Sequence, residues 1–230
     1  MEIKVSVRGL VEFLLRTGDI DNRKKSAPDD AMAEGSRIHR MIQKKMGSSY
    51  HAEVMLRYRR DCGEYDLVVE GRADGIIDSV AVDEIKGTYR DLSRMKEPNP
   101  VHLAQAKCYA WMYGQEHGKE RMEVSMTYCN IETEEIRYFK FVYEMSDLEE
   151  WFDSLLQEYR KWSDADIAWK KLRQDSIHSL SFPFPYREGQ KELVTHVYHT
   201  ICHSRKLFIE APTGAGKTIS TVFPAVKAGG

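Results

Sequence analysis

The sequence predicts an α/β fold, in which helices flank a mixed central β-sheet and a smaller, incomplete unit follows. Apolar residues recur at helical spacing over the first 46 positions, and β-branched residues gather in short runs between positions 50 and 87. Helical spacing returns from about position 101. At 230 residues the chain can form a sizeable core without disulfides.

The first half of the chain is expected to form two helices and a meander. The helices are predicted at residues 6–15 and 30–46, where Ser6 and the pair of Asp29 and Asp30 are candidate N-caps. Residues 50–87 contain three runs with the texture of antiparallel strands, separated by turn residues.

The second half is also expected to combine helices and strands. A helix is predicted over residues 101–113, and two strand-like runs then flank the polar turn at 132–135. Residues 147–177 show helical spacing that we assign to two helices. The first domain is expected to comprise residues 1–179.

A composition break follows. Residues 180–186 contain two prolines within three positions, which disfavour both helix and internal strand, and we assign them as a linker. Beyond the linker we expect a helix at 187–203, a short strand at 206–210, a glycine-rich loop and the start of another helix. Residues 187–230 are thus predicted to be a separate, truncated unit.

Composition excludes several classes of protein. Cys62, Cys108, Cys129 and Cys202 lie far apart and form no CxxC pair, which argues against a zinc or iron–sulfur site and against a secreted disulfide framework. The sequence shows neither a secretory signal nor a stretch of membrane-spanning length, so we expect a soluble, cytoplasmic protein. The net charge of −2 means that any nucleic acid would be held by local basic patches.

One face of the predicted sheet could hold a metal ion and a base. Glu84 and Lys86 are two apart in a predicted strand, so their side chains point to the same face. Asp74 lies on the preceding strand and could bring a second carboxylate to that point, which suits Mg²⁺ or Mn²⁺. His39, on the second predicted helix, could add an imidazole ligand. Taken singly, each of these residues is more commonly an ordinary surface or core residue.

The order of four residue pairs along the chain is more informative than any one of them. They follow the patterns GxxxH, GxxD, (D/E)xK and QxxxY, and they are Gly35 with His39, Gly71 with Asp74, Glu84 with Lys86, and Gln105 with Tyr109. In this order the first three-quarters of the chain resembles the RecB-like branch of the PD-(D/E)xK nucleases. The resemblance implies a restriction-endonuclease-like fold and a metal-dependent DNA nuclease.

The resemblance also implies roles for single residues. His39, Asp74 and Glu84 would be metal ligands together with the carbonyl of Ile85, and Lys86 would be the catalytic lysine beside Asp74 and Glu84. A cation polarises the phosphoryl oxygen in phosphodiester hydrolysis, and a nearby ammonium orients water or stabilises developing charge. We expect Mg²⁺ or Mn²⁺ as the cofactor.

Gln105 and Tyr109 are four apart on a predicted helix and therefore share a face. Their amide and phenol could hydrogen-bond to the phosphates of DNA or help to position Lys86. Some relatives in this branch hold an iron–sulfur cluster with four cysteines. The cysteine spacing in this chain does not match theirs, so no iron–sulfur cluster is expected.

The segment APTGAGKT follows a predicted strand and opens a predicted helix, which is the context of a phosphate-binding P-loop. Lys217 would reach the β- and γ-phosphates of a nucleotide, and Thr218 would hold magnesium. Together with FPYREGQ upstream, this segment resembles the start of superfamily 2 helicases of the DinG/XPD type. The nucleotide-binding residues implied are Arg187, Gln190, Thr213, Gly214, Gly216, Lys217 and Thr218.

Only twelve residues follow Thr218, and a Walker B strand and a second motor domain are missing from them. We therefore expect a fragment of a longer nuclease–helicase that binds ATP only in the intact parent protein, with the remainder of the helicase chain as its partner. This fragment alone is not expected to hydrolyse ATP or to unwind DNA.

The motifs are compatible with two functions. The leading one is a metal-dependent DNA nuclease, an exonuclease acting on single strands or ends by family resemblance. The alternative is a helicase fragment whose N-terminal domain is a non-catalytic DNA-binding module. The sequence leaves DNA and RNA, and exonuclease and endonuclease action, as open alternatives. Basic residues that could contact phosphate, or equally lie on solvated faces, are Arg57, Arg59, Arg60, Arg90, Arg94 and Lys96.

Overall fold

The computed structural model describes residues 1–18 and 31–229, and these form two compact units, Met1–Lys161 and Trp162–Gly230. The boundary falls inside helix α4 (Met145–Ser179), which is continuous. The prediction of two separate helices between residues 147 and 177 is therefore wrong. Neither glycine nor proline occurs within α4, so nothing in its sequence interrupts the helix.

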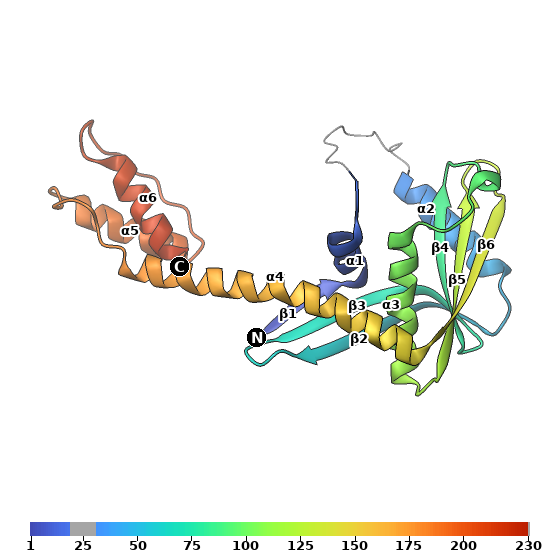
Figure 1. Ribbon diagram of the computed structural model, residues 1–230. Coiled ribbons are helices and arrows are strands. Elements are labelled where there is room, and N and C mark those ends of the chain that lie inside the picture. The colour runs from blue at the N-terminus through green and yellow to red at the C-terminus, as the bar shows by residue number, and fades with distance from the viewer. Residues whose placement is uncertain (19–30, 230) are drawn as a thin grey trace. The chain divides into compact units, whose positions relative to one another are not determined.

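The first unit is built on a mixed β-sheet, in agreement with the predicted fold class (Figure 1). β1 pairs with β3 and β4 pairs with β5 in parallel, whereas the other neighbouring strands are antiparallel. The six strands found among the described residues are β1 (Glu2–Ser6), β2 (Tyr50–Asp61), β3 (Asp66–Ile77), β4 (Ala81–Thr88), β5 (Arg121–Asn130) and β6 (Ile136–Glu144).

Strand β1 was not predicted, because it is short and runs directly into a helix. Ser6 ends the strand and is also the N-cap of α1 (Val7–Leu15), where its Oγ accepts a hydrogen bond of 3.0 Å from the N–H of Gly9. The predicted cap at Ser6 is confirmed. The candidate caps Asp29 and Asp30 lie outside the described residues.

Strand β3 is paired differently along its two edges. β2 pairs with residues 66–73 and 75–77 on one edge, so that β1 and β4 must share the other. On that edge β1 pairs with residues 66–70 and β4 pairs with residues 75–77. Residues 71–74 therefore face an opening in the sheet between β1 and β4, and Asp74 lies at the end of this opening.

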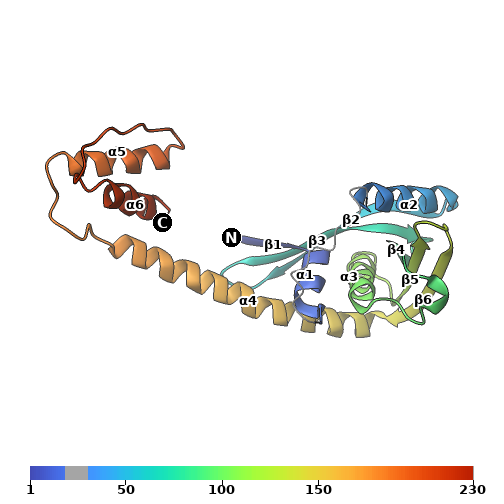
Figure 2. The same ribbon diagram turned by 90° about the horizontal axis from the view of Figure 1, so that it is seen from above.

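Helices cover both faces of the sheet (Figure 2). α2 (Ala31–Lys45) lies on one face, and α1, α3 (Pro100–Glu116) and the first part of α4 lie on the other. Ile38 and Ile42 of α2 pack against Ile85 and Cys129 of the sheet. On the opposite face the ring of Trp111 stacks on Phe152 with 4.2 Å between the ring centroids. Both helix layers thus bury apolar side chains against the strands that carry the predicted motifs.

The second unit contains α5 (Gln190–Cys202) and α6 (Lys217–Ala228) in addition to the end of α4. The strand expected at residues 206–210 is absent, since residues 205–212 form neither helix nor strand. A strand requires a neighbour for its backbone hydrogen bonds, and the described part of this unit offers none. Phe208 is accordingly 94% exposed.

None of the helices in the described ranges is both long enough and apolar enough to cross a membrane.

Candidate functional site

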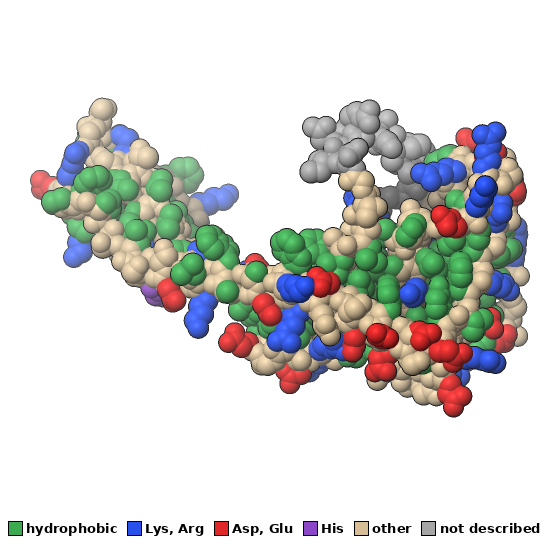
Figure 3. All heavy atoms as spheres, viewed as in Figure 1, with side chains coloured by type: hydrophobic (Ala, Val, Ile, Leu, Met, Phe, Trp, Pro, Cys, Tyr) green, Lys and Arg blue, Asp and Glu red, His purple; other side chains and the backbone are tan. Residues whose placement is uncertain are grey.

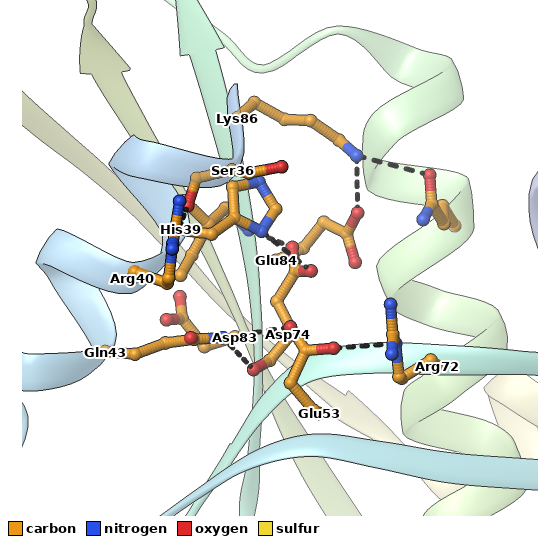
Figure 4. Close-up of polar contacts among 12 residues, drawn as sticks. Ser36, His39, Arg40, Gln43, Glu53, Arg72, Asp74, Asp83, Glu84 and Lys86 are labelled. Carbon is orange, nitrogen blue, oxygen red and sulfur yellow. Dashed lines mark hydrogen bonds and ion pairs between the residues drawn. The ribbon is translucent and has the colours of Figure 1, made fainter. Parts of the chain in front are cut away.

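The opening in the sheet brings Asp74 into contact with two other elements (Figure 4). Its Oδ2 accepts a hydrogen bond of 2.7 Å from the backbone N–H of Ile85 on β4. Its Oδ1 lies 3.2 Å from Nδ1 of His39 on α2. His39 and Asp74, which the sequence proposes as ligands of one metal, are thus adjacent in space. The two carboxylate oxygens of Asp74 contact different partners.

Glu84 and Lys86 lie on the same face of β4, as their spacing predicts. Lys86 Nζ is 2.6 Å from Glu84 Oε1 and 3.5 Å from Gln105 Oε1. Glu84 is only 1% exposed, and within the described residues neither of its oxygens accepts a hydrogen bond of good geometry. A carboxylate that is buried with one ion pair and no other hydrogen-bond partner is costly, and a further cation would complete its surroundings.

Burial raises the pKa of Glu84 well above its ordinary value, because the charged form is poorly solvated. The charge of Lys86 opposes this shift, and the charge of Asp74 adds to it. Glu84 is therefore harder to ionise than an exposed carboxyl group in the absence of a further cation. A divalent cation bound nearby would offset this cost.

The pKa of His39 is raised by its neighbour. Burial lowers it, but the hydrogen bond and the negative charge of Asp74 outweigh burial and leave the pKa above its ordinary value. A neutral imidazole next to a carboxylate is also suited to bind a cation. His39 and Asp74 thus lie in contact and together offer donors that could hold a cation.

The backbone of Ile85 contributes to the same opening. Its N–H points toward β3, where Asp74 accepts it. In an extended strand the N–H and C=O of one residue point to the same edge, so the Ile85 carbonyl also faces the opening. The side chain of Ile85 points the other way, into the apolar cluster beneath α2. This placement agrees with the ligand role that the family resemblance implies for the Ile85 carbonyl.

Helix α3 closes the site from the other face through Gln105 and Tyr109, which are 9% and 3% exposed. Tyr109 packs against Gly71, where a Cβ atom would lie 2.7 Å from the tyrosine oxygen. Burial and the charge of Glu84 raise the pKa of Tyr109, so its phenol remains a hydrogen-bond donor. Gly71 is therefore needed at the opening because it leaves room for this phenol.

Two residues that the sequence did not indicate, Gln43 and Tyr50, contact the backbone carbonyl of Asp74. Gln43 Nε2 donates to the Asp74 carbonyl at 3.0 Å and to Glu53 Oε1 at 3.3 Å. The Tyr50 hydroxyl lies 3.3 Å from the same carbonyl. Gln43 is four residues after His39 on α2, so this helix contacts both the side chain and the backbone of Asp74. Helical spacing from His39 was the one sequence signal that could have indicated Gln43.

Glu53 approaches the metal-ligand pair from β2. Ligand atoms of His39, Glu53 and Asp74 all lie within 4.8 Å of one another, a grouping that does not include Glu84. Glu53 has a left-handed φ of 58° and forms an ion pair of 2.7 Å with Arg72. Its side chain is thus held at the rim of the opening by Arg72 and Gln43.

Asp83 is a second buried carboxylate, 1% exposed, that the sequence did not single out. It accepts hydrogen bonds from Tyr50 at 3.1 Å and from Thr127 at 2.5 Å. Burial raises the pKa of Asp83, whereas these two hydrogen bonds lower it. Unlike Glu84, Asp83 has both oxygens satisfied within the protein, which indicates a structural role.

In the second unit several residues proposed for nucleotide binding lie together. Lys217 Nζ donates to the carbonyls of Ala211 and Pro212, both at 2.9 Å. Arg187 donates to the carbonyl of Gly214, and its own N–H donates to Gln190 Oε1 at 3.0 Å.

The loop itself depends on its glycines. Gly214 and Gly216 have positive φ angles of 85° and 74°, and a Cβ atom at Gly216 would lie 2.4 Å from Gln190. Thr218 lies in the first turn of α6, and Thr213 lies in the loop before it. The segment therefore has the turn geometry that the glycine pattern predicts.

No family model matches this chain. Over 46 residues it is 46% identical to the probable ATP-dependent helicase MJ0942 of Methanocaldococcus jannaschii, a match that covers 20% of this chain and 7% of the helicase. The chain thus spans less than a tenth of the curated relative that it matches.

Solved structures with a similar backbone have low sequence identity. The crystal structure of SSO0001 is 17% identical with a TM-score of 0.45, covering 67% of this chain and 75% of that one. The structure of LHK-Exo in complex with dAMP is 14% identical with a TM-score of 0.48, covering 76% and 94%. A further structure of this alkaline exonuclease, from Laribacter hongkongensis, is 13% identical with a TM-score of 0.37, covering 71% and 94%. Function has to be inferred from the site itself.

Proposed function

We propose that residues 1–179 are a metal-dependent DNA nuclease of the RecB-like PD-(D/E)xK type. The observation that carries the proposal is Glu84, a fully buried carboxylate beside the sheet opening at Asp74. Among the described residues its oxygens have one close contact, the ion pair of Oε1 with Lys86, and accept no hydrogen bond of good geometry. A carboxylate that only stabilised the fold would be expected to be satisfied within the protein, as Asp83 is.

The donors at the opening fit a hard divalent cation. Asp74 and Glu84 offer carboxylate oxygens, Ile85 offers a carbonyl and His39 offers an imidazole, a set that suits Mg²⁺ or Mn²⁺. A bound cation would polarise the phosphoryl oxygen and lower the pKa of a water molecule.

Lys86 is the residue that the chain itself positions for catalysis. Contacts to Glu84 and Gln105 hold its ammonium on the same face of β4 as Glu84. An ammonium in this position can orient the attacking water or stabilise the negative charge that develops on the phosphate. Gln105 would position Lys86, and the phenol of Tyr109 would donate a hydrogen bond to a DNA phosphate.

The proposed substrate is DNA, with a preference for single strands or ends. This preference comes from the motif resemblance, as does exonuclease action. All four motif pairs contribute residues to one opening, which supports the resemblance from which the preference is taken.

We further propose that the second unit is the first part of a helicase P-loop domain. The contacts of Arg187 and Gln190 with the glycine-rich loop support this assignment, as does the short match to a probable helicase. Lys217 is held on loop carbonyls from which a phosphate would draw it away. ATP would then be a ligand of the longer parent protein, and the linker at 180–186 would join the two domains.

The nuclease proposal is tested with end-labelled single- and double-stranded DNA in Mn²⁺, Mg²⁺ or EDTA. We expect metal-dependent cleavage by the wild type and a loss of about 10²–10⁴-fold in Lys86→Ala. Lys4→Ala removes an exposed lysine of the same unit and is the matched control, with unchanged activity expected. Absence of cleavage in every metal, or full activity of Lys86→Ala, would overturn the proposal.

A further inference from the structure

The segment between β4 and α3 forms a cavity beside the proposed site. It begins four residues after Lys86 and ends at the helix that carries Gln105. The cavity has a volume of about 690 Å³, within the range of binding pockets for small ligands or one to two nucleotides. Its lining residues are Arg90, Asp91, Arg94, Met95, Lys96, Glu97, Pro98, Asn99 and Pro100.

This segment is fixed to the rest of the first unit. Asn130 on β5 donates to the carbonyl of Arg90 at 3.1 Å. Arg137 on β6 donates to the carbonyls of Leu92 and Ser93 at 2.7 Å and 3.2 Å. The side chain of Leu92 is fully buried. The cavity is therefore preformed, and a ligand that binds there loses less free energy to ordering of the loop than it would with a free loop.

The basic residues that could contact phosphate fall into two groups. In the first group each cation already has a carboxylate partner: Arg57 with Glu2, Arg59 with Asp66, Arg60 with Asp153 and Arg94 with Asp91. The second group is Arg90 and Lys96, which are exposed and form no ion pair with any residue that the structure describes. Both members of the second group line the cavity.

The pKa of His102, a residue near the cavity, responds to the positive charge of Arg90. His102 lies in the first turns of α3, and its Nδ1 is 3.0 Å from the Tyr128 hydroxyl. Burial and the positive charges of Lys86, Arg8 and Arg90 together lower the pKa of His102 to about 4, against the charge of Glu12. Lys86 and Arg90 thus both act on a side chain at the start of α3.

We propose that this cavity binds the phosphodiester backbone of the DNA strand next to the phosphate that Lys86 faces, with Arg90 and Lys96 as its two phosphate contacts. The identity of the strand as DNA rests on the proposed nuclease function. Four residues of extended chain span at most about 14 Å, so the cavity lies within a few nucleotides of the opening at Asp74.

The test is fluorescence anisotropy of a labelled single-stranded oligonucleotide with the full chain in EDTA, so that cleavage does not interfere. We expect Arg90→Ala/Lys96→Ala to raise Kd about tenfold or more. The slope of log K against log salt should become shallower by about 1.4, because each phosphate contact on a single strand contributes about 0.7. Both side chains are exposed, and circular dichroism verifies that the variant folds.

The matched control is Arg121→Ala/Lys140→Ala, which removes two exposed charges of the same sign from β5 and β6. Arg121 begins β5, at the end of the strand opposite Asn130, so we expect wild-type affinity and salt slope. A wild type that does not bind the oligonucleotide overturns the inference. Equal losses in both double variants do so too, because they indicate a response to net charge alone.

Cleavage assays with the same proteins separate this inference from the proposed function. If the wild type cuts no DNA in any metal but its binding depends on Arg90 and Lys96, the inference stands and the nuclease proposal fails. If the wild type cuts DNA and the Arg90→Ala/Lys96→Ala variant binds as the wild type does, the inference fails and the nuclease proposal stands.

Discussion

The carboxylate of Asp74 links three elements of the fold through His39 and Ile85. Its Oδ2 accepts the N–H of Ile85 at 2.7 Å, and its Oδ1 lies 3.2 Å from His39 Nδ1. These contacts tie β3 to β4 and to α2 at the place where the sheet opens. A substitution at Asp74 therefore changes the electrostatics of a helix residue as well as the proposed metal site.

Asp74→Asn is expected to lower the pKa of His39. The hydrogen bond and charge of Asp74 hold that pKa above its ordinary value, and without the charge the effect of burial dominates and lowers it. Titration of the histidine ring signals by NMR in metal-free buffer measures the change. Asp91→Asn, a surface substitution, should leave the His39 signals unchanged. An unaltered His39 pKa in Asp74→Asn would contradict the contact.

Glu84→Gln is expected to stabilise the metal-free protein and to abolish cleavage. Because burial raises the folded-state pKa of Glu84, its ionisation destabilises the fold. This cost is absent below the unfolded-state pKa, grows as pH rises toward the folded-state pKa, and is fully present above it. Lys86 is partly exposed and can turn to water when it loses its partner.

Urea unfolding in EDTA measures this effect. At pH 8 we expect Glu84→Gln to be more stable by on the order of 1–3 kcal/mol, and at pH 4 we expect the difference to vanish. A variant less stable than the wild type at pH 8 would mean that the Glu84 carboxylate stabilises the metal-free fold, which contradicts the expectation for a metal ligand.

Metal affinity is expected to rise with pH across the neutral range. Protons compete with a cation for Glu84 and His39, and the pKa values of both groups are raised in the folded protein. Isothermal titration with Mn²⁺ between pH 5.5 and 8 measures the dependence, with Glu84→Gln as the weak-binding control. A flat affinity over this interval would show that neither group binds the cation.

Lys217→Ala is expected to leave DNA cleavage unchanged. Lys217 contacts only loop carbonyls of the second unit among the hydrogen bonds that the structure describes for it. Cleavage rates of the variant and the wild type, measured side by side on one end-labelled strand, check the expectation. A loss comparable to that of Lys86→Ala would place the P-loop in the nuclease function.

The parts of the site that the sequence could predict are those fixed by short-range periodicity. The two-residue period of a strand places Glu84 and Lys86 on one face, and the spacing of Gln105 and Tyr109 places both on one side of α3. The sequence placed Asp74 near Glu84 across adjacent antiparallel strands, and in the structure its carboxylate accepts the N–H of Ile85, the residue after Glu84.

What could not be predicted depends on contacts between distant segments. Tyr50 reaches Asp83 across 33 positions because β2 pairs with β3 in a register that no local pattern specifies. The same register brings Glu53 to the rim of the site. Residues 206–210 failed as a strand for the opposite reason, since local propensity cannot supply a missing neighbour.

Tyr50→Phe tests whether this long-range network positions the site. Burial and the charge of Asp83 raise the pKa of Tyr50, so its phenol remains a donor, and it lies within reach of both Asp83 Oδ2 and the Asp74 carbonyl. Removing the hydroxyl leaves a buried carboxylate oxygen without this hydrogen bond, which should destabilise the fold by about 1–3 kcal/mol. The looser backbone at Asp74 should also weaken Mn²⁺ binding.

Tyr138→Phe provides the matched control, because Tyr138 is 54% exposed on β6. Urea unfolding and Mn²⁺ titration should then give wild-type values for Tyr138→Phe and reduced stability and affinity for Tyr50→Phe. Reduced stability with unchanged affinity would restrict Tyr50 to a structural role. Unchanged stability would mean that the Tyr50 hydroxyl contributes nothing measurable to holding Asp83, and that Thr127 alone is sufficient.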